Sequence, residues 1–109
     1  MPWEEAFIQK IFKEIKMGEE GALKEAIGEF AARLAVSKIS LQKYRLLLME
    51  LVTEIFRFIG NNQINGDAIF GQDSDIYNQV LQLESTQALR DWLEKNCMKM
   101  HRQVLHERQ

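Results

Sequence analysis

The stretch LQKYRLLLMELVTEIFRFI, residues 41–59, constrains the fold of this chain more than any other segment. Its apolar residues recur at steps of three and four, which is the period of a helix. A helix that is apolar around most of its circumference lies in the middle of a bundle, or has a second face covered by a partner. We therefore expect a helical bundle built on this long, apolar central helix. Its main stripe is Tyr44, Leu47, Leu48, Leu51, Val52, Ile55, Phe56 and Ile59, and Leu46, Met49 and Phe58 widen it.

Helical periodicity continues on both sides of this segment. It predicts one helix over residues 3–17, a second over 19–36 and a long C-terminal helix over 86–108. Ser40 and Ser85 are the expected N-caps of the central and the last helix. No repeat and no alternating pattern is present, so we predict one all-α domain over 1–109, a bundle of about four to five helices.

The segment NNQINGDAIFGQDSD, between the two longest helices, is rich in turn-forming residues. We expect Gly60 to end the central helix and a short helical turn to form through Asp67–Phe70. A second short helix should follow, capped by Asp73 or Ser74. Asp73, Asp75 and Glu84 also stand at positions one, three and twelve of a calcium loop. Tyr77 and Asn78 break that pattern at positions five and six, so capping is the better interpretation.

The overall charge excludes some partners. Basic and acidic residues number 14 and 16, and no basic patch is present, so this segment is not expected to touch nucleic acid. The start MPWEEAF has neither the basic residues nor the apolar run of a signal peptide. Charged residues interrupt the apolar region 46–59, which excludes a membrane span. With Cys97 as the only cysteine, a cytoplasmic location is favoured.

Reactive side chains are few. Cys97 and His101 lie four residues apart on the last helix and could face one metal ion, but His106 points away and no other Cys or His is present. We expect no metal, and Cys97 to be a core or interface residue. Pairs such as Ser74–Asp75 or Glu94–His101 occur in any helical protein of this composition. No catalytic residue, enzyme activity or cofactor is predicted.

The two tryptophans have different expected environments. Trp92 lies on the apolar stripe of the last helix and should be a core residue that packs on the central helix. Trp3 lies at the start of the first helix, where it could be a core residue or an exposed contact for a neighbouring domain.

Three segments together resemble a known family. They are MGEEGALKEAIGEFAARL, then ISLQKYRLLLMELVTEIFRFI, then the AIFG turn with LESTQALRDWLEKNCMKMHRQVLHER and its Leu-x-x-Trp-Leu core. In this order they resemble the helical segment of AraC-family bacterial transcription regulators, of the YesN-like two-component response regulator type. The resemblance extends from about residue 5 to the end. It implies that the chain is a linker domain from a larger regulator, without its N-terminal receiver or sensor domain and its C-terminal helix-turn-helix pair.

The resemblance implies a function in transcription regulation and signal transduction. The domain would couple signal input to DNA-binding output through helix packing or dimerisation, with a second copy and its flanking domains as partners. Leu93, Cys97, Met100 and Val104 follow the four-three-four spacing of a coiled-coil seam and are the candidate connector or interface. The same stripe could pack within the bundle. For Met100 and Val104, partner and bundle are equally open.

A different class of function is a small-molecule sensor. Five methionines and several phenylalanines could line an apolar pocket in the bundle core. Only Tyr44, Tyr77 and Arg45 offer polar groups that could fix a ligand there.

Overall fold

The computed structural model describes residues 3–73 and 75–108, and all regular structure in them is helical. The all-α bundle that the sequence predicts is confirmed. The helices are α1 (Trp3–Met17), α2 (Glu20–Val36), α3 (Leu41–Asn61), α4 (Gly66–Phe70), α5 (Ile76–Leu81) and α6 (Thr86–Glu107). None of these helices is long and apolar enough to cross a membrane.

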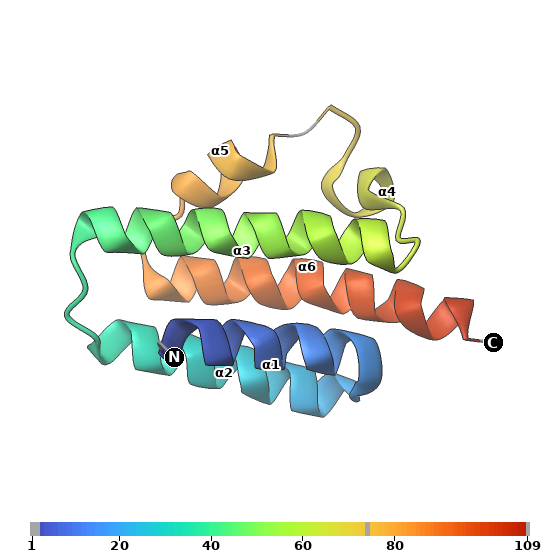
Figure 1. Ribbon diagram of the computed structural model, residues 1–109, viewed down its shortest axis with the longest axis horizontal. Coiled ribbons are helices and arrows are strands. Elements are labelled where there is room, and N and C mark those ends of the chain that lie inside the picture. Colours follow the sequence, from blue (N-terminus) through green and yellow to red (C-terminus); the bar gives the residue numbers. More distant parts are fainter. Residues whose placement is uncertain (1–2, 74, 109) are drawn as a thin grey trace.

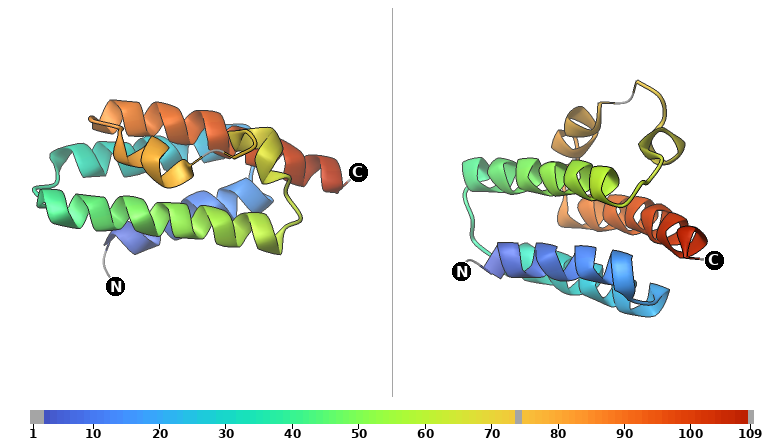
Figure 2. Two further views of the ribbon diagram at one scale, coloured as in Figure 1. Left: turned by 90° about the horizontal axis from the view of Figure 1, so that it is seen from above. Right: turned by 45° about the vertical axis from the view of Figure 1, so that its right-hand side comes forward.

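The helices lie in layers (Figure 1). Helices α1 and α2 form one layer, and α3 and α6 lie above them. The short helices α4 and α5 lie over the line between α3 and α6, as the view from above shows (Figure 2). Within the described residues, α6 packs on α1, α2 and α4. The C-terminal helix therefore occupies the middle of the fold, and α3 lies along its side.

Two of the side chains that α6 buries in the middle of the fold are polar. The His101 ring contacts the Ile15 carbonyl of α1 through Nδ1 at 2.8 Å, and the Asn96 amide donates to the Trp92 carbonyl at 2.9 Å. Since both polar groups are satisfied, their burial carries no large penalty. The buried residues of α6 are Leu89, Leu93, Asn96, Cys97, Met98, Met100, His101 and Val104.

Helix α3 has two apolar faces, which differ in their exposure to solvent. One is buried and consists of Leu47, Leu48, Leu51, Val52, Ile55 and Phe58. The ring of Phe58 packs on that of Phe12 with centroids 5.6 Å apart, whereas Phe56 is half exposed. The sequence assigned these two phenylalanines the opposite way, with Phe56 in the main stripe. That assignment was wrong, because periodicity shows that a side is apolar and not which neighbour covers it.

The sequence predicted that helix α3 ends at Gly60, but the helix does not end there. It continues to Asn61, and Asn62 caps it by donating its backbone and side-chain N–H groups to the Phe58 carbonyl at 3.0 and 2.9 Å. The left-handed turn falls on Gln63, with φ of 55°, and Ile64 then donates to the Ile59 carbonyl. This is the bond of a Schellman motif, in which glycine usually holds the position of Gln63.

The predicted N-caps are confirmed at the two long helices. Ser40 accepts from the Lys43 amide at 3.1 Å, and Ser85 from the Ala88 amide at 3.0 Å. The cap of α5 was predicted wrongly. It is Asp75, which accepts from the Asn78 amide at 3.1 Å. Ser74, the alternative cap, lies outside the described residues.

The two tryptophans are packed against the edge of the core, where each contacts another aromatic ring. Trp92 stacks on Phe70 of α4 with centroids 5.9 Å apart and donates to Gln79 of α5 at 3.3 Å. The expected packing on α3 is thus replaced by packing on the two short helices. Trp3 is partly buried and meets Phe7 edge-on at 5.6 Å, with the Arg33 guanidinium 5.1 Å from its ring centroid.

Candidate functional site

The connector stripe predicted on α6 is inside the bundle. Leu93, Cys97, Met100 and Val104 are at most 7% exposed. Side chains of this chain's own helices cover them, so a second chain could touch them only if the bundle opened. The sequence left open whether Met100 and Val104 pack against a partner or within the bundle. In the structure they pack within the bundle. Any coupling through this stripe would have to act through core packing.

The Cys97–His101 pair lies in the same core. Burial raises the pKa of the Cys97 thiol from 9.0 to about 12, which disfavours the thiolate that a metal would need. The Nδ1 atom of His101 is occupied by the Ile15 carbonyl. Among residues 3–73 and 75–108, no group of three His, Cys, Asp or Glu side chains could hold a metal ion.

The residues of the calcium-like pattern serve local structure. The two carboxylate oxygens of Asp75 accept from the amide and the side chain of Asn78 at 3.1 and 2.9 Å. Asp73 forms a turn with φ of 60°. Helix capping, the interpretation preferred from the sequence, therefore describes what Asp75 does.

The second apolar face of α3 is open to solvent and continues onto α5. Large apolar side chains that are 37–59% exposed gather there. Leu46, Met49 and Phe56 share one side of α3, with Thr53 between them, at the alternating steps of three and four that also describe a coiled-coil seam. We call this surface the exposed apolar face; its residues are Leu46, Met49, Phe56, Tyr77 and Leu81.

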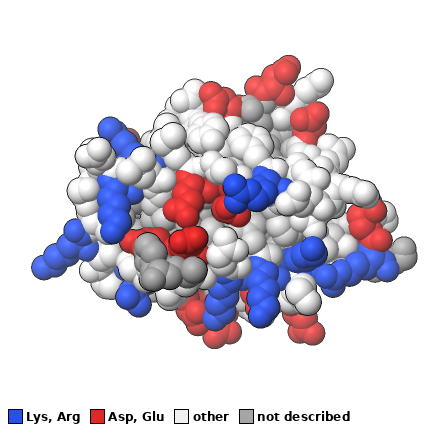
Figure 3. Space-filling view, in the orientation of Figure 1, with Lys and Arg blue, Asp and Glu red and all other residues white. Residues whose placement is uncertain are grey.

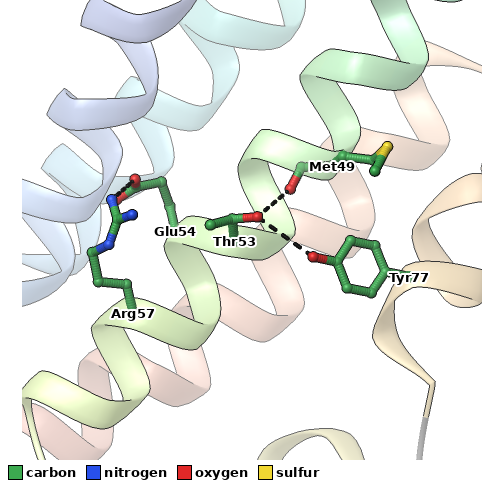
Figure 4. Close-up of polar contacts among 5 residues, drawn as sticks. All are labelled: Met49, Thr53, Glu54, Arg57 and Tyr77. Atoms are coloured by element: carbon green, nitrogen blue, oxygen red, sulfur yellow. Dashed lines mark hydrogen bonds and ion pairs between the residues drawn. The ribbon is translucent and has the colours of Figure 1, made fainter.

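Contacts between α3 and α5 make this face one continuous surface (Figure 4). The rings of Phe56 and Tyr77 are 6.1 Å apart, and the Tyr77 hydroxyl lies 3.4 Å from that of Thr53. Thr53 donates to the carbonyl of Met49 at 2.9 Å. The hydroxyl proton of Thr53 is thereby used, so Tyr77 is the donor between the two hydroxyls.

A charged groove borders the same face on the side of α1. It has a volume of about 230 Å³, and we call it the acidic groove; it is lined by Glu4, Glu5, Ile39, Lys43, Leu46, Leu47 and Glu50. Figure 3 shows acidic side chains near the centre of this view, between α3 and α1, with basic ones on either side. Leu46 belongs to both surfaces, so the acidic groove and the exposed apolar face adjoin.

The carboxylates of the groove are incompletely paired. Glu4 is buried, and its Oε1 atom has no hydrogen-bond partner although the Lys43 ammonium lies 3.4 Å away. We regard this contact as an ion pair without hydrogen-bond geometry. Partial burial raises the pKa of Glu50, and the nearby charges of Glu5, Glu54 and Glu4 raise it further. Like charges therefore repel one another around this groove.

A second cleft, of about 350 Å³, lies between the end of α3, α4 and the start of α5. Phe56 lines its edge, with Ile59, Ile64 and Phe70 as further apolar walls. It is open at the surface, and none of the polar side chains suggested for a ligand, Tyr44, Tyr77 and Arg45, lines it. The ligand-sensor alternative therefore stays a prediction, because neither this cleft nor the acidic groove is lined by those groups.

Comparisons with models of protein families, with curated proteins and with solved structures found no match to this chain. The geometry of its surface is accordingly the basis for assigning a function. Sequence reasoning noted Leu46 and Met49 only as a widening of the central stripe. It missed the acidic groove, whose residues come from α1, α3 and the segment before α3. For the exposed apolar face, the available signal in the sequence was the width of the apolar stripe on the central helix, which already indicated a second covered face.

Proposed function

We propose that this chain is a non-catalytic protein-interaction domain that binds another protein through its exposed apolar face. The observation that supports this function is the clustering of five half-exposed large apolar side chains across α3 and α5. Single exposed apolar residues are common, whereas a contiguous patch of them is typical of a surface that another molecule covers.

A more specific version follows from the resemblance to AraC-type regulators. In that version the chain is a cytoplasmic regulatory segment, and binding at the exposed apolar face changes how a DNA-binding domain is held. The homodimer expected through the α6 stripe is not the form we propose, because that stripe is buried in its own bundle. The open reading frame tests the AraC version: two helix-turn-helix motifs encoded after Gln109 would support it, and a stop codon there would remove it.

Photo-crosslinking in the native host tests the interaction function. A photoreactive p-benzoylphenylalanine replaces Met49 on the exposed apolar face, or Glu25 on the exposed surface of α2 as a control. We expect a defined adduct, identified by mass spectrometry, at Met49 and not at Glu25. Adding Leu46→Gln should weaken it, since Gln keeps the helix propensity and removes the apolar contact. Equal labelling at both positions, or at neither, would contradict the proposed function.

A further inference from the structure

We propose, building on the proposed function, that the exposed apolar face binds an amphipathic helix of a second protein that places a Lys or Arg side chain in the acidic groove. The partner is thus a basic helix with an apolar stripe. It is neither a second copy of this chain nor a membrane or nucleic acid.

The dimensions of the face suit a helix. Leu46 and Phe56 are ten residues apart, which corresponds to about 15 Å along α3, or roughly three turns. A partner with apolar residues at i, i+3 or i+4, and i+7 would contact α3 over this length. Tyr77, the part of the face on α5, lies on one side of Thr53 (Figure 4), and Glu54 and Arg57 lie on the other. The Thr53 hydroxyl in the middle is already hydrogen-bonded, so an apolar side chain can cover it.

The carboxylates beside the exposed apolar face favour the binding of a cation. Glu5 and Glu50 line the acidic groove, and neither forms an ion pair within the described residues. The buried Glu4 has an oxygen without a hydrogen bond, and Lys43, its ion-pair partner among the described residues, has a side chain that is 59% exposed. Among the described residues, the three carboxylates of the groove thus have one ammonium partner, Lys43, which pairs with Glu4. A further cation would relieve the repulsion that also raises the pKa of Glu50.

The groove also fits the rest of a basic side chain. Ile39, Leu46 and Leu47 give it apolar walls, against which the methylene groups of Lys or Arg can pack while the charged end meets Glu5 and Glu50. Leu46 is shared with the exposed apolar face. The cationic residue of the partner must therefore lie directly beside its apolar stripe.

Other occupants suit these charges less well. Anionic lipids and nucleic acids would be repelled by the unpaired carboxylates. A second copy would bring its own acidic groove. Of the three basic residues on its α3, Lys43 and Arg57 are already paired with Glu4 and Glu54 at 3.4 and 2.5 Å, which leaves Arg45 as the only one without an ion pair among the described residues. A heterologous basic helix supplies the missing charge without breaking these pairs.

Fluorescence anisotropy with two matched peptides tests the partner class. Both probes are fluorescein-labelled 16-residue helix-forming peptides with the same leucines at i, i+3, i+7 and i+10. One has Lys beside the stripe, and the other has Glu there. The full chain should bind the Lys peptide about tenfold or more tightly than the Glu peptide, a typical effect of charge complementarity at an interface.

Two double variants locate the effect. Glu5→Gln with Glu50→Gln should reduce the Lys preference to about threefold or less, because a neutral amide keeps the shape of the groove without its charge. Glu19→Gln with Glu25→Gln changes the net charge equally, at the exposed N-cap of α2 and on the exposed surface of that helix, and should keep the preference. Leu46→Gln with Met49→Gln should weaken both peptides at least tenfold. Circular dichroism checks that each variant remains helical.

Each contrary outcome has a defined meaning. Failure of both peptides to bind, equal binding of the two, or an undiminished preference in Glu5→Gln/Glu50→Gln would overturn the basic-helix partner. The proposed function would still stand if the Met49 crosslink forms. A dimer in light scattering that Leu46→Gln/Met49→Gln dissociates would assign the face to a second copy. That result would likewise overturn the partner class and retain the interaction function.

Discussion

Single residues in the core show how polar groups are accommodated where hydrophobic packing dominates. His101 is 1% exposed, yet its Nδ1 atom meets the Ile15 carbonyl near the end of α1. The last carbonyls of a helix lack partners within that helix, so the histidine satisfies one of them from outside. The pair that first suggested a metal site is thus part of the packing between α6 and α1.

The Cys97 thiol gives a prediction about pH. Its folded-state pKa of about 12 lies above the ordinary value of 9.0, so the folded protein keeps the thiol proton where the unfolded chain has lost it. Ionisation of the thiol therefore has no effect on stability below about pH 9, and it lowers stability as pH rises from there towards 12. By pH 10 this amounts to about 1 kcal/mol.

Urea denaturation of the wild type and Cys97→Ala at pH 8, 9 and 10 measures this effect. The stability difference between the two proteins should narrow by about 1 kcal/mol over that range, because alanine cannot titrate. Parallel pH dependences would show that the thiol ionises in the folded state as easily as in the unfolded one.

At the scale of elements, helix ends decide where the surface residues point. α3 continues one residue past Gly60, and the left-handed turn falls on Gln63. The sequence could predict that a turn follows the central helix, because glycine and asparagine cluster there. Which residue adopts positive φ was not predictable, since the Ile64-to-Ile59 bond and the burial of Ile64 set the end of the helix.

The end of α3 yields a paired prediction. Gly60→Ala should stabilise the protein by about 0.5–1 kcal/mol, because Gly60 is helical and an added Cβ meets nothing within 4 Å. Gln63→Gly should also stabilise it, by roughly 0.5 kcal/mol, because relief of a left-handed conformation outweighs the larger entropy of glycine when unfolded. Thermal and urea unfolding measure both. Destabilisation by Gly60→Ala would instead place the helix end at Gly60, as the sequence alone suggested.

At the scale of the whole molecule, the position of α6 separates core from surface. The candidate connector residues on it are covered by the chain's own helices, and the large exposed apolar surface lies on α3 and α5. The proposed interaction surface therefore lies on the outer helix of the fold, away from the stripe whose spacing resembled a coiled coil.

Truncation of two apolar residues on α6 tests this arrangement. Met100→Ala should cost about 2–4 kcal/mol of unfolding free energy, because Met100 is 0% exposed and its loss leaves a cavity. Leu105→Ala, at a side chain that is 38% exposed, should cost under about 1 kcal/mol. Urea denaturation measures both. Similar small costs would indicate that Met100 lies at a surface, as the connector hypothesis required.

Local patterns in the sequence determined the helical class, the approximate extents of the long helices and the caps at Ser40 and Ser85, because periodicity and capping depend on residues close together in the chain. Tertiary structure alone decided that Phe58 and not Phe56 is buried, that α6 lies in the middle, and that Glu4 and Glu5 meet Glu50 across more than forty residues. A side chain's partner on another helix depends on how the helices pack, and no local pattern records that arrangement.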